Sequence, residues 1–231
     1  MTIAGYKVLV DWNNDGDFSD SNEDITGDVM GFDSVRGRNY ASQLTGRSIA
    51  GALTVELDNS SDKYNSFNTG SALTGNILPG RKVQIQYSGS TFPYTFPVFF
   101  DGAPLWTGFL QRIDPKIDQR RRKTATLIAF GPLAKVNQKK VRVEMQTSYR
   151  TDLAIGKVLD DVQWPADDRD LSTGNTTMTR WFVNDDLGLE ALRNIEGSEM
   201  GFIWETVDGK IAFNDRKYRL RETKSITSQA T

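Results

Sequence analysis

The stretch that decides the fold is LTVELDNSSDKYNSFNTGSALTGNILPGRKVQIQY, residues 53–87. Apolar residues alternate with polar ones from Leu53 to Leu57, and they do so again from Val83 to Tyr87. Alternation with a period of two is typical of a half-buried β-strand. The sequence therefore predicts two strands joined by a long polar connection.

That connection, residues 58–80, is rich in Asn, Ser, Asp and Gly. A loop of about twenty residues is uncommon in a compact domain and usually means function or disorder. Apolar side chains spaced through it argue against disorder: Tyr64, Phe67, Leu73, Ile77 and Leu78. Such anchors need a surface, either the chain's own sheet or another subunit. We predict that they form a subunit interface.

Composition limits the possible functions. The 231 residues allow one or two domains, and the net charge of −2 gives no general attraction to nucleic acid or anionic membranes. The chain has no Cys and no His, which excludes disulfides, thiolate metal sites and His-dependent nucleophilic catalysis. No apolar run is long enough to span a membrane, and the N-terminus lacks a secretory pattern. We therefore expect a protein that is not an enzyme.

The first part of the chain, residues 1–135, is expected to be a β-rich domain. Short strands are predicted at residues 6–10, 28–36, 48–58, 81–87, 98–100, 105–114 and 123–130. Several short strands separated by turns are typical of a β-sandwich or barrel. The last two predicted strands would form a hairpin across the charged link at residues 115–122.

The second part, residues 136–231, has a different pattern and predicts a small α+β domain. A first helix would be capped by Ser148 or Thr151 and would end before Pro165. A second helix would begin near Asn184 or Asp185.

The second helix would be followed by Gly201 as its C′ residue. A hairpin, residues 202–206 and 210–214, would then turn at Asp208-Gly209. The expected fold class is thus mainly β, a barrel or sandwich followed by a two-helix and β-hairpin domain.

These pieces resemble, in the same order, phage tail proteins of the baseplate hub class. The matching stretches are residues 53–85, Gln163-Trp164-Pro165, residues 169–174 and 176–178, and the set Ala191, Leu192, Arg193, Glu199, Gly201, Phe202, Asp208, Gly209, Ile211, Phe213, Asp215 and Arg216. The resemblance implies a β-barrel that continues the tail tube and a small second domain that braces the ring. In the resembled proteins a further β-rich domain follows, so this chain is expected to be part of a longer protein.

The resemblance also implies partners and a location. The ring would be a trimer, with a hexamer as the alternative, and it would contact other tail proteins that connect to host attachment. DNA would be met only in passage through the lumen. The protein would be located in the virion tail and assembled in the host cytoplasm.

Residues 11–25, DWNNDGDFSDSNEDI, predict a calcium loop as one of two alternatives. The candidate ligands are Asp11, Asn13, Asp15, Asp17 through its backbone carbonyl, and Glu23. Gly16 falls at the required turn, but Asn22 holds the position of the bidentate Glu, and Glu23 comes one place late. Oxygen ligands alone would favour calcium and loop stiffening. The alternative is a polar turn whose Asx side chains bond their own backbone.

A basic cluster occupies the predicted hairpin turn: Lys116, Arg120, Arg121, Arg122 and Lys123. In a tube it could face DNA that passes through the lumen. The simpler alternative is a solvated tip that pairs with Asp114 and Asp118, or with an acidic patch on a neighbour.

The sequence leaves two other functions open. A calcium-stiffened carbohydrate-binding or adhesin module could use a platform of Trp106, Trp164, Trp181 and Trp204. A glycosidase would need a carboxylate pair from Asp160, Asp161, Asp167, Asp168 and Asp170. These acids are predicted at a helix end and in a loop, where solvation explains them.

Overall fold

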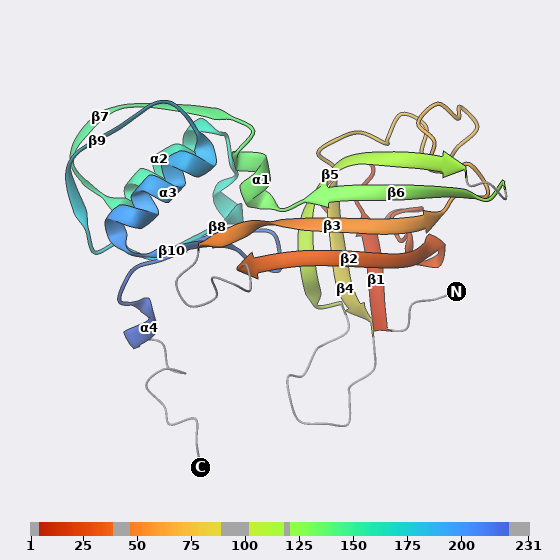
Figure 1. The fold of residues 1–231 in the computed structure, drawn as a ribbon, viewed down its shortest axis with the longest axis horizontal. Coiled ribbons are helices and arrows are strands. Elements are labelled where there is room, and N and C mark those ends of the chain that lie inside the picture. Colours follow the sequence, from red (N-terminus) through yellow and green to blue (C-terminus); the bar gives the residue numbers. More distant parts are fainter. Residues whose placement is uncertain (1–4, 39–46, 89–101, 118–120, 222–231) are drawn as a thin grey trace, which may run out of the picture. The chain divides into compact units, whose positions relative to one another are not determined.

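The structure is a computed structural model that describes residues 5–38, 47–88, 102–117 and 121–221 (Figure 1). The predicted strand at 98–100 and Arg120 lie outside these residues. The chain divides into two compact units. The first unit comprises Met1–Arg36, Gly51–Gly131 and Val207–Gly209, and the second comprises Gly37–Ala50, Pro132–Thr206 and Lys210–Thr231.

The first unit is built on a six-stranded sheet with the strand order β1-β4-β5-β6-β3-β2. The strands are β1 (Gly5–Val10), β2 (Val29–Arg38), β3 (Ser48–Asp58), β4 (Lys82–Ser88), β5 (Pro104–Ile117) and β6 (Lys123–Phe130), and the 3-10 helix η1 (Thr26–Asp28) precedes β2. β5 and β6 pair antiparallel from Phe109–Phe130 to Ile117–Lys123, which confirms the predicted hairpin.

This sheet is curled into a half-barrel. β1 and β2 are the two edges of the strand order, yet the ring centroids of Tyr6 and Phe32 lie only 5.5 Å apart. Figure 1 shows β1 and β4 running across the direction of β3 and β6, as strong curling requires. The concave side holds a core that includes Val10, Leu57 and Ile85.

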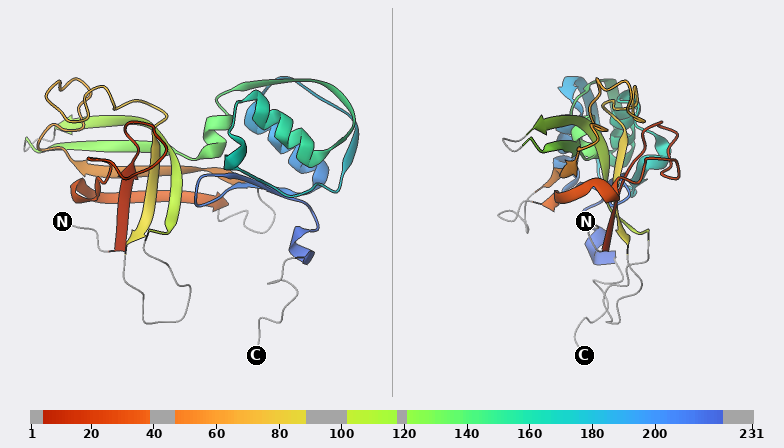
Figure 2. Two further views of the ribbon diagram at one scale, coloured as in Figure 1. Left: turned by 180° about the vertical axis from the view of Figure 1, so that it is seen from behind. Right: turned by 90° about the vertical axis from the view of Figure 1, so that its right-hand side faces the viewer.

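The second unit contains two small sheets, β7-β9 and β10-β11-β8. Its elements are α1 (Pro132–Val136), β7 (Lys140–Arg150), α2 (Thr151–Asp161), η3 (Ala166–Asp168), β8 (Arg169–Leu171), β9 (Thr177–Leu187), α3 (Gly188–Glu199), β10 (Phe202–Glu205), β11 (Ile211–Asn214) and α4 (Tyr218–Arg221). Figure 2 shows α2 and α3 side by side under the curved β7–β9 ribbon. Their buried faces include Ile155 and Leu159 of α2 and Leu192 and Ile195 of α3.

Two short segments belong to a different unit from the parts of the chain that flank them. The turn Val207–Gly209 lies in the hairpin between β10 and β11 but belongs to the first unit, where Thr107 Oγ1 donates to the Val207 carbonyl at 2.8 Å. The end of β2 from Gly37 and the start of β3 up to Ala50 belong to the second unit, where the Arg193 guanidinium donates to the Ser48 carbonyl.

The predicted fold class, mainly β with a small α+β second region, is confirmed. Several local predictions in the second unit are wrong. Neither Ser148 nor Thr151 caps α2, because the helix begins at Thr151 and the Thr151 hydroxyl donates to Glu199 Oε2 instead. The second helix begins at Gly188, since residues 177–187 form β9.

Gly201 follows α3 as predicted, but its role is different. The left-handed residue is Met200, with φ of 54°. Gly201 is needed because a Cβ there would lie 2.6 Å from the Asn214 carbonyl oxygen. No helix in the described part of the chain is long and apolar enough to cross a membrane.

Candidate functional site

The long loop between β3 and β4 is tied to its own sheet. Tyr64 and Leu73 expose only 1% and 2% of their surface and belong to the core of the first unit. Ile77 is partly buried against the same core. Tyr64 and Leu73 are therefore core residues, which corrects their assignment to a subunit interface. Burial of these anchors explains why a polar loop of this length keeps a defined path.

A polar contact fixes the loop beside the start of β2. The Tyr64 hydroxyl donates to Asp28 Oδ2, and Lys63 Nζ lies 3.0 Å from the same oxygen. Asn59 Oδ1 accepts the Tyr64 backbone N–H at 2.9 Å. Burial, together with the Asp28 carboxylate, raises the pKa of Tyr64 well above its ordinary value, so the phenol remains a donor.

The rest of the loop is held by short side-chain to backbone bonds. Asn65 and Asn68 each accept an N–H two residues ahead, and Ser71 Oγ donates to the Lys63 carbonyl at 2.7 Å. On this braced loop Phe67 exposes 90% of its surface and Leu78 exposes 49%. An apolar side chain that is almost fully exposed on an ordered loop is available for contact with a partner. Phe67 and Leu78 therefore remain the candidates for the predicted subunit interface.

The Asp11–Glu23 loop brings carboxylates together. Oxygens of Asp11, Asp15 and Glu23 lie within 4.8 Å of one another, and Asp11 and Glu23 are buried. Glu23, one place later than in an EF-hand, thus reaches the cluster that the sequence predicted. Asp17 is not part of this carboxylate group, and its Oδ1 accepts from Ser19.

The same loop also shows the hydrogen bonds of a polar turn. Asp11 accepts the N–H groups of Asn14 and Gly16, and the Asn13 amide donates to Asp15 Oδ2 at 2.8 Å. Burial and the nearby Asp11 charge raise the pKa of Glu23. A divalent cation among these carboxylates would offset their mutual repulsion. The residues present therefore fit a calcium ion.

The basic cluster stands at the β5–β6 turn. Lys116, Arg121 and Arg122 are exposed, and Lys123 is half-buried. Lys123 Nζ lies 3.7 Å from the Asp62 carboxylate, and Arg122 contacts Met30 Sδ at 2.8 Å. The cluster is thus partly engaged with its own unit, as the solvated-tip alternative expects, although through different partners.

The alternatives that need a sugar platform or a carboxylate pair gain no support. Trp106, Trp164 and Trp181 expose 2%, 5% and 9% of their surface, so they are core residues. Asp160 pairs with Arg169 at 2.7 Å. The Asp160 carboxylate thus faces a guanidinium and not a second carboxylate.

The second unit contains a cavity of about 660 Å³ that sequence reasoning missed. Its lining includes Arg47, Met200, Trp204, Arg216 and Tyr218, which come from three separate segments of the chain. No spacing in the sequence brings these segments together. The only local signal is Met200, a large apolar residue that exposes 69% of its surface beside a helix end.

Searches with protein-family models and against curated protein sequences found no match. Solved structures, however, are similar. The 43 kDa tail protein of prophage MuSo2 from Shewanella oneidensis matches with a TM-score of 0.55 and 11% identity over 91% of this chain and 54% of that chain. The tail protein from Neisseria meningitidis MC58 matches with a TM-score of 0.55 and 12% identity, over 90% and 50%. This chain has the fold of phage tail proteins.

The tail-protein fold is shared more widely. A chain in the Francisella PdpA–VgrG complex matches with a TM-score of 0.50 and 13% identity over 90% of this chain and 31% of that chain. The present chain spans about half the length of the two tail proteins. The resemblance to phage tail proteins predicted from the sequence is confirmed.

Proposed function

We propose that this chain is a structural component of a phage tail tip or baseplate hub. In this proposal, copies of it form a ring that continues the tail tube and connects the tube to distal tail proteins. The observation that carries the proposal is the tail-protein fold, matched over 91% and 90% of the chain. The similar chains are tail proteins by name, which supports a structural role rather than an enzymatic one.

The exposed side of the long loop supplies the subunit contact in this proposal. Phe67 and Leu78 are exposed, while Tyr64 and Leu73 hold the loop in place from inside the core. An apolar anchor on a fixed loop loses little conformational freedom when it binds, which favours association. A trimer is the proposed ring, and a hexamer is the alternative. The tail would be assembled in the host cytoplasm, and DNA would only pass through the lumen.

The test is the mass and shape of the purified chain in solution, by light scattering coupled to size exclusion and by negative-stain microscopy. We expect closed rings that are lost in Phe67→Ala/Leu78→Ala. The matched control is Leu153→Ala, an exposed residue of α2 (46% of its surface), which should leave the rings intact. A strict monomer at every concentration contradicts ring formation by this chain. Deleting residues 65–74 is a poorer test, because it also removes the buried Leu73.

We also propose that the Asp11–Glu23 loop binds one calcium ion that stiffens it. The supporting observation is the group of three carboxylates within 4.8 Å, two of them buried. Calcium prefers oxygen ligands, and these residues supply only oxygen. The ion would stabilise the link between β1 and β2 and would have no catalytic role.

A further inference from the structure

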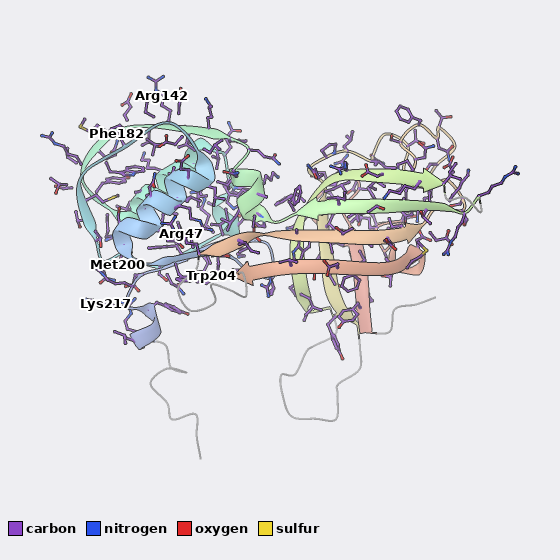
Figure 3. All side chains as sticks on the ribbon, in the orientation of Figure 1. Arg47, Arg142, Phe182, Met200, Trp204 and Lys217 are labelled. Atoms are coloured by element: carbon purple, nitrogen blue, oxygen red, sulfur yellow. The ribbon has the colours of Figure 1, made fainter. Side chains whose placement is uncertain are left out.

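The cavity of the second unit has an apolar lining. Met200 exposes 69% of its surface, and the ring centroids of Phe202 and Trp204 lie 6.4 Å apart. Figure 3 labels Arg47, Met200, Trp204 and Lys217, which belong to or adjoin this cavity. A volume of about 660 Å³ exceeds that of a single aromatic side chain. The cavity can therefore accept an apolar anchor with its flanking residues.

The exposed charged side chains at the cavity are basic. Its acids are buried and already paired: Glu196 with Arg193 at 2.8 Å, and Asp215 with Arg221 at 2.7 Å. The exposed charges come from basic residues: Arg47 and Arg216, whose side chains are 58% and 37% exposed, and the adjacent exposed Lys217. Arg47 also lies 3.5 Å from buried Glu196, which Arg193 already pairs, and Arg216 lies 3.6 Å from buried Glu199, so each guanidinium has one side toward an acid and one side toward solvent. A ligand that matches this cavity combines an apolar side chain with carboxylates.

The first unit carries a segment with that chemistry. No Lys or Arg occurs between Lys7 and Arg36, and the sequence DGDFSD occupies residues 15–20. Asp15, Asp17 and Asp20 are exposed, and Phe18 stands among them half-buried. The loop is held from beneath by Trp12, whose indole N–H donates to the Asn22 carbonyl at 2.9 Å.

We propose that the cavity of one copy receives residues 15–20 of a second copy, with Phe18 against Met200 and Trp204, and Asp17 and Asp20 facing Arg47 and Arg216. This inference rests on the proposed ring function and names a contact that would build the ring. Because it joins two different surfaces, the contact is heterologous, and its repetition gives a closed ring or an open filament. The apolar anchor supplies affinity, and the charges supply specificity and speed of association.

Phe67 is the competing occupant, because it exposes 90% of its surface. Its neighbours Asn65, Ser66 and Asn68 are uncharged, and the nearby Lys63 is basic. These residues offer no carboxylate to Arg47, Arg216 and Lys217 at the cavity. Charge complementarity therefore favours residues 15–20.

The test uses two variants of the full chain that each lose one surface. Asp17→Lys/Asp20→Lys breaks the loop surface while leaving Asp11, Asp15 and Glu23 in place. Met200→Asp/Lys217→Glu breaks the cavity surface, and Asp tolerates the left-handed backbone at this position. We expect each variant alone to be monomeric in sedimentation velocity, because the ring needs both contacts and the small Phe67 and Leu78 contact does not hold two copies together without the cavity contact. An equimolar mixture should form a 1:1 dimer and nothing larger, since one working contact remains in each pair.

Circular dichroism should show that both variants are folded. If the lysines disturb the loop, Asp17→Asn/Asp20→Asn removes the charge with less change, and we expect about tenfold weaker association. A mixture that stays monomeric overturns the contact, as does survival of wild-type oligomers in either variant. Rings that persist in both variants but disappear in Phe67→Ala would assign the contact to Phe67 and leave the ring function standing. A 1:1 dimer in the mixture together with open wild-type filaments would keep the contact and overturn the closed ring.

Discussion

Tyr64 and Asp28 join two parts of the first unit that are 36 residues apart in sequence. The Tyr64 phenol donates to the Asp28 carboxylate at the start of β2 and anchors the long loop from beneath. Removing the hydroxyl with Tyr64→Phe should lower the free energy of unfolding by about 1–3 kcal/mol, as for hydrogen bonds to charged groups. Urea denaturation measures this. Tyr6→Phe, at a 39% exposed tyrosine, is the control and should have little effect.

Substitutions of the buried anchors of the loop and of its exposed residues should have different effects on stability. Leu73→Ala leaves a cavity in the core and should cost about 2–5 kcal/mol of stability. Phe67→Ala removes an exposed side chain and should change stability by less than about 0.5 kcal/mol. Equal losses of stability in the two variants, measured by urea denaturation, would mean that Phe67 packs against the core.

Calcium should raise the melting temperature if the Asp11 loop binds it. At a free concentration about 100 times the dissociation constant, one site adds about 2.7 kcal/mol. Asp11→Asn and Glu23→Gln should abolish the shift in differential scanning fluorimetry, whereas Asp33→Asn, an exposed acid on β2, should keep it. An identical melting temperature with calcium and with chelator would leave the loop as a plain polar turn.

Glu199 should make the second unit sensitive to acid. Burial alone raises its pKa, but hydrogen bonds from Thr151 and from the Thr176 N–H outweigh burial and lower the pKa below its ordinary value of 4.5. A lowered pKa in the folded state gives stability that is present above the unfolded-state pKa and is lost as pH falls through the folded-state pKa. Glu199→Gln should therefore flatten the stability profile between pH 6 and pH 3, measured by denaturation at about ten pH values.

The matched control for this prediction is Glu190→Gln, at an exposed acid of the same helix. It should keep the wild-type slope. If Glu199→Gln has the wild-type slope as well, the acid sensitivity comes from other carboxylates.

Local alternation predicted part of the fold well. β3 and β6 were predicted with their observed bounds, because each has one face on the core and one face outside. β7 and β9 were missed, since only short runs such as Val141–Val143 and Trp181–Val183 alternate in burial within strands of 11 residues. Asn184 favours a helix N-cap because Asn is a common N-cap residue and is rare in strands, yet β9 continues through it to Leu187.

The sequence predicted some residues of the candidate sites and missed others, because only residues that are close in the sequence leave a local pattern. The acidic loop is contiguous, so Asp11, Asp15 and Glu23 could be found from spacing alone. Whether a loop residue faces its own core or solvent depends on the curl of the sheet, which is why Tyr64 and Phe67 could not be told apart. The cavity around Trp204 is formed by segments that are far apart in the sequence, so no local sequence pattern predicts it.

The bond between Thr107 and Val207 has a consequence for biosynthesis. Thr107 is 3% exposed, and the turn that accepts its hydroxyl proton is translated long after the strands of its own sheet. At roughly 5–20 residues per second, the ribosome releases β1 to β6 seconds before residues 207–209. Until then the Thr107 hydroxyl has only the bond that it accepts from Gln84 Nε2 at 2.9 Å, and fragments that end before Val207 lack the second bond. The second bond of Thr107 thus forms only after the turn between β10 and β11 has emerged, so one contact of the first unit is completed late in translation.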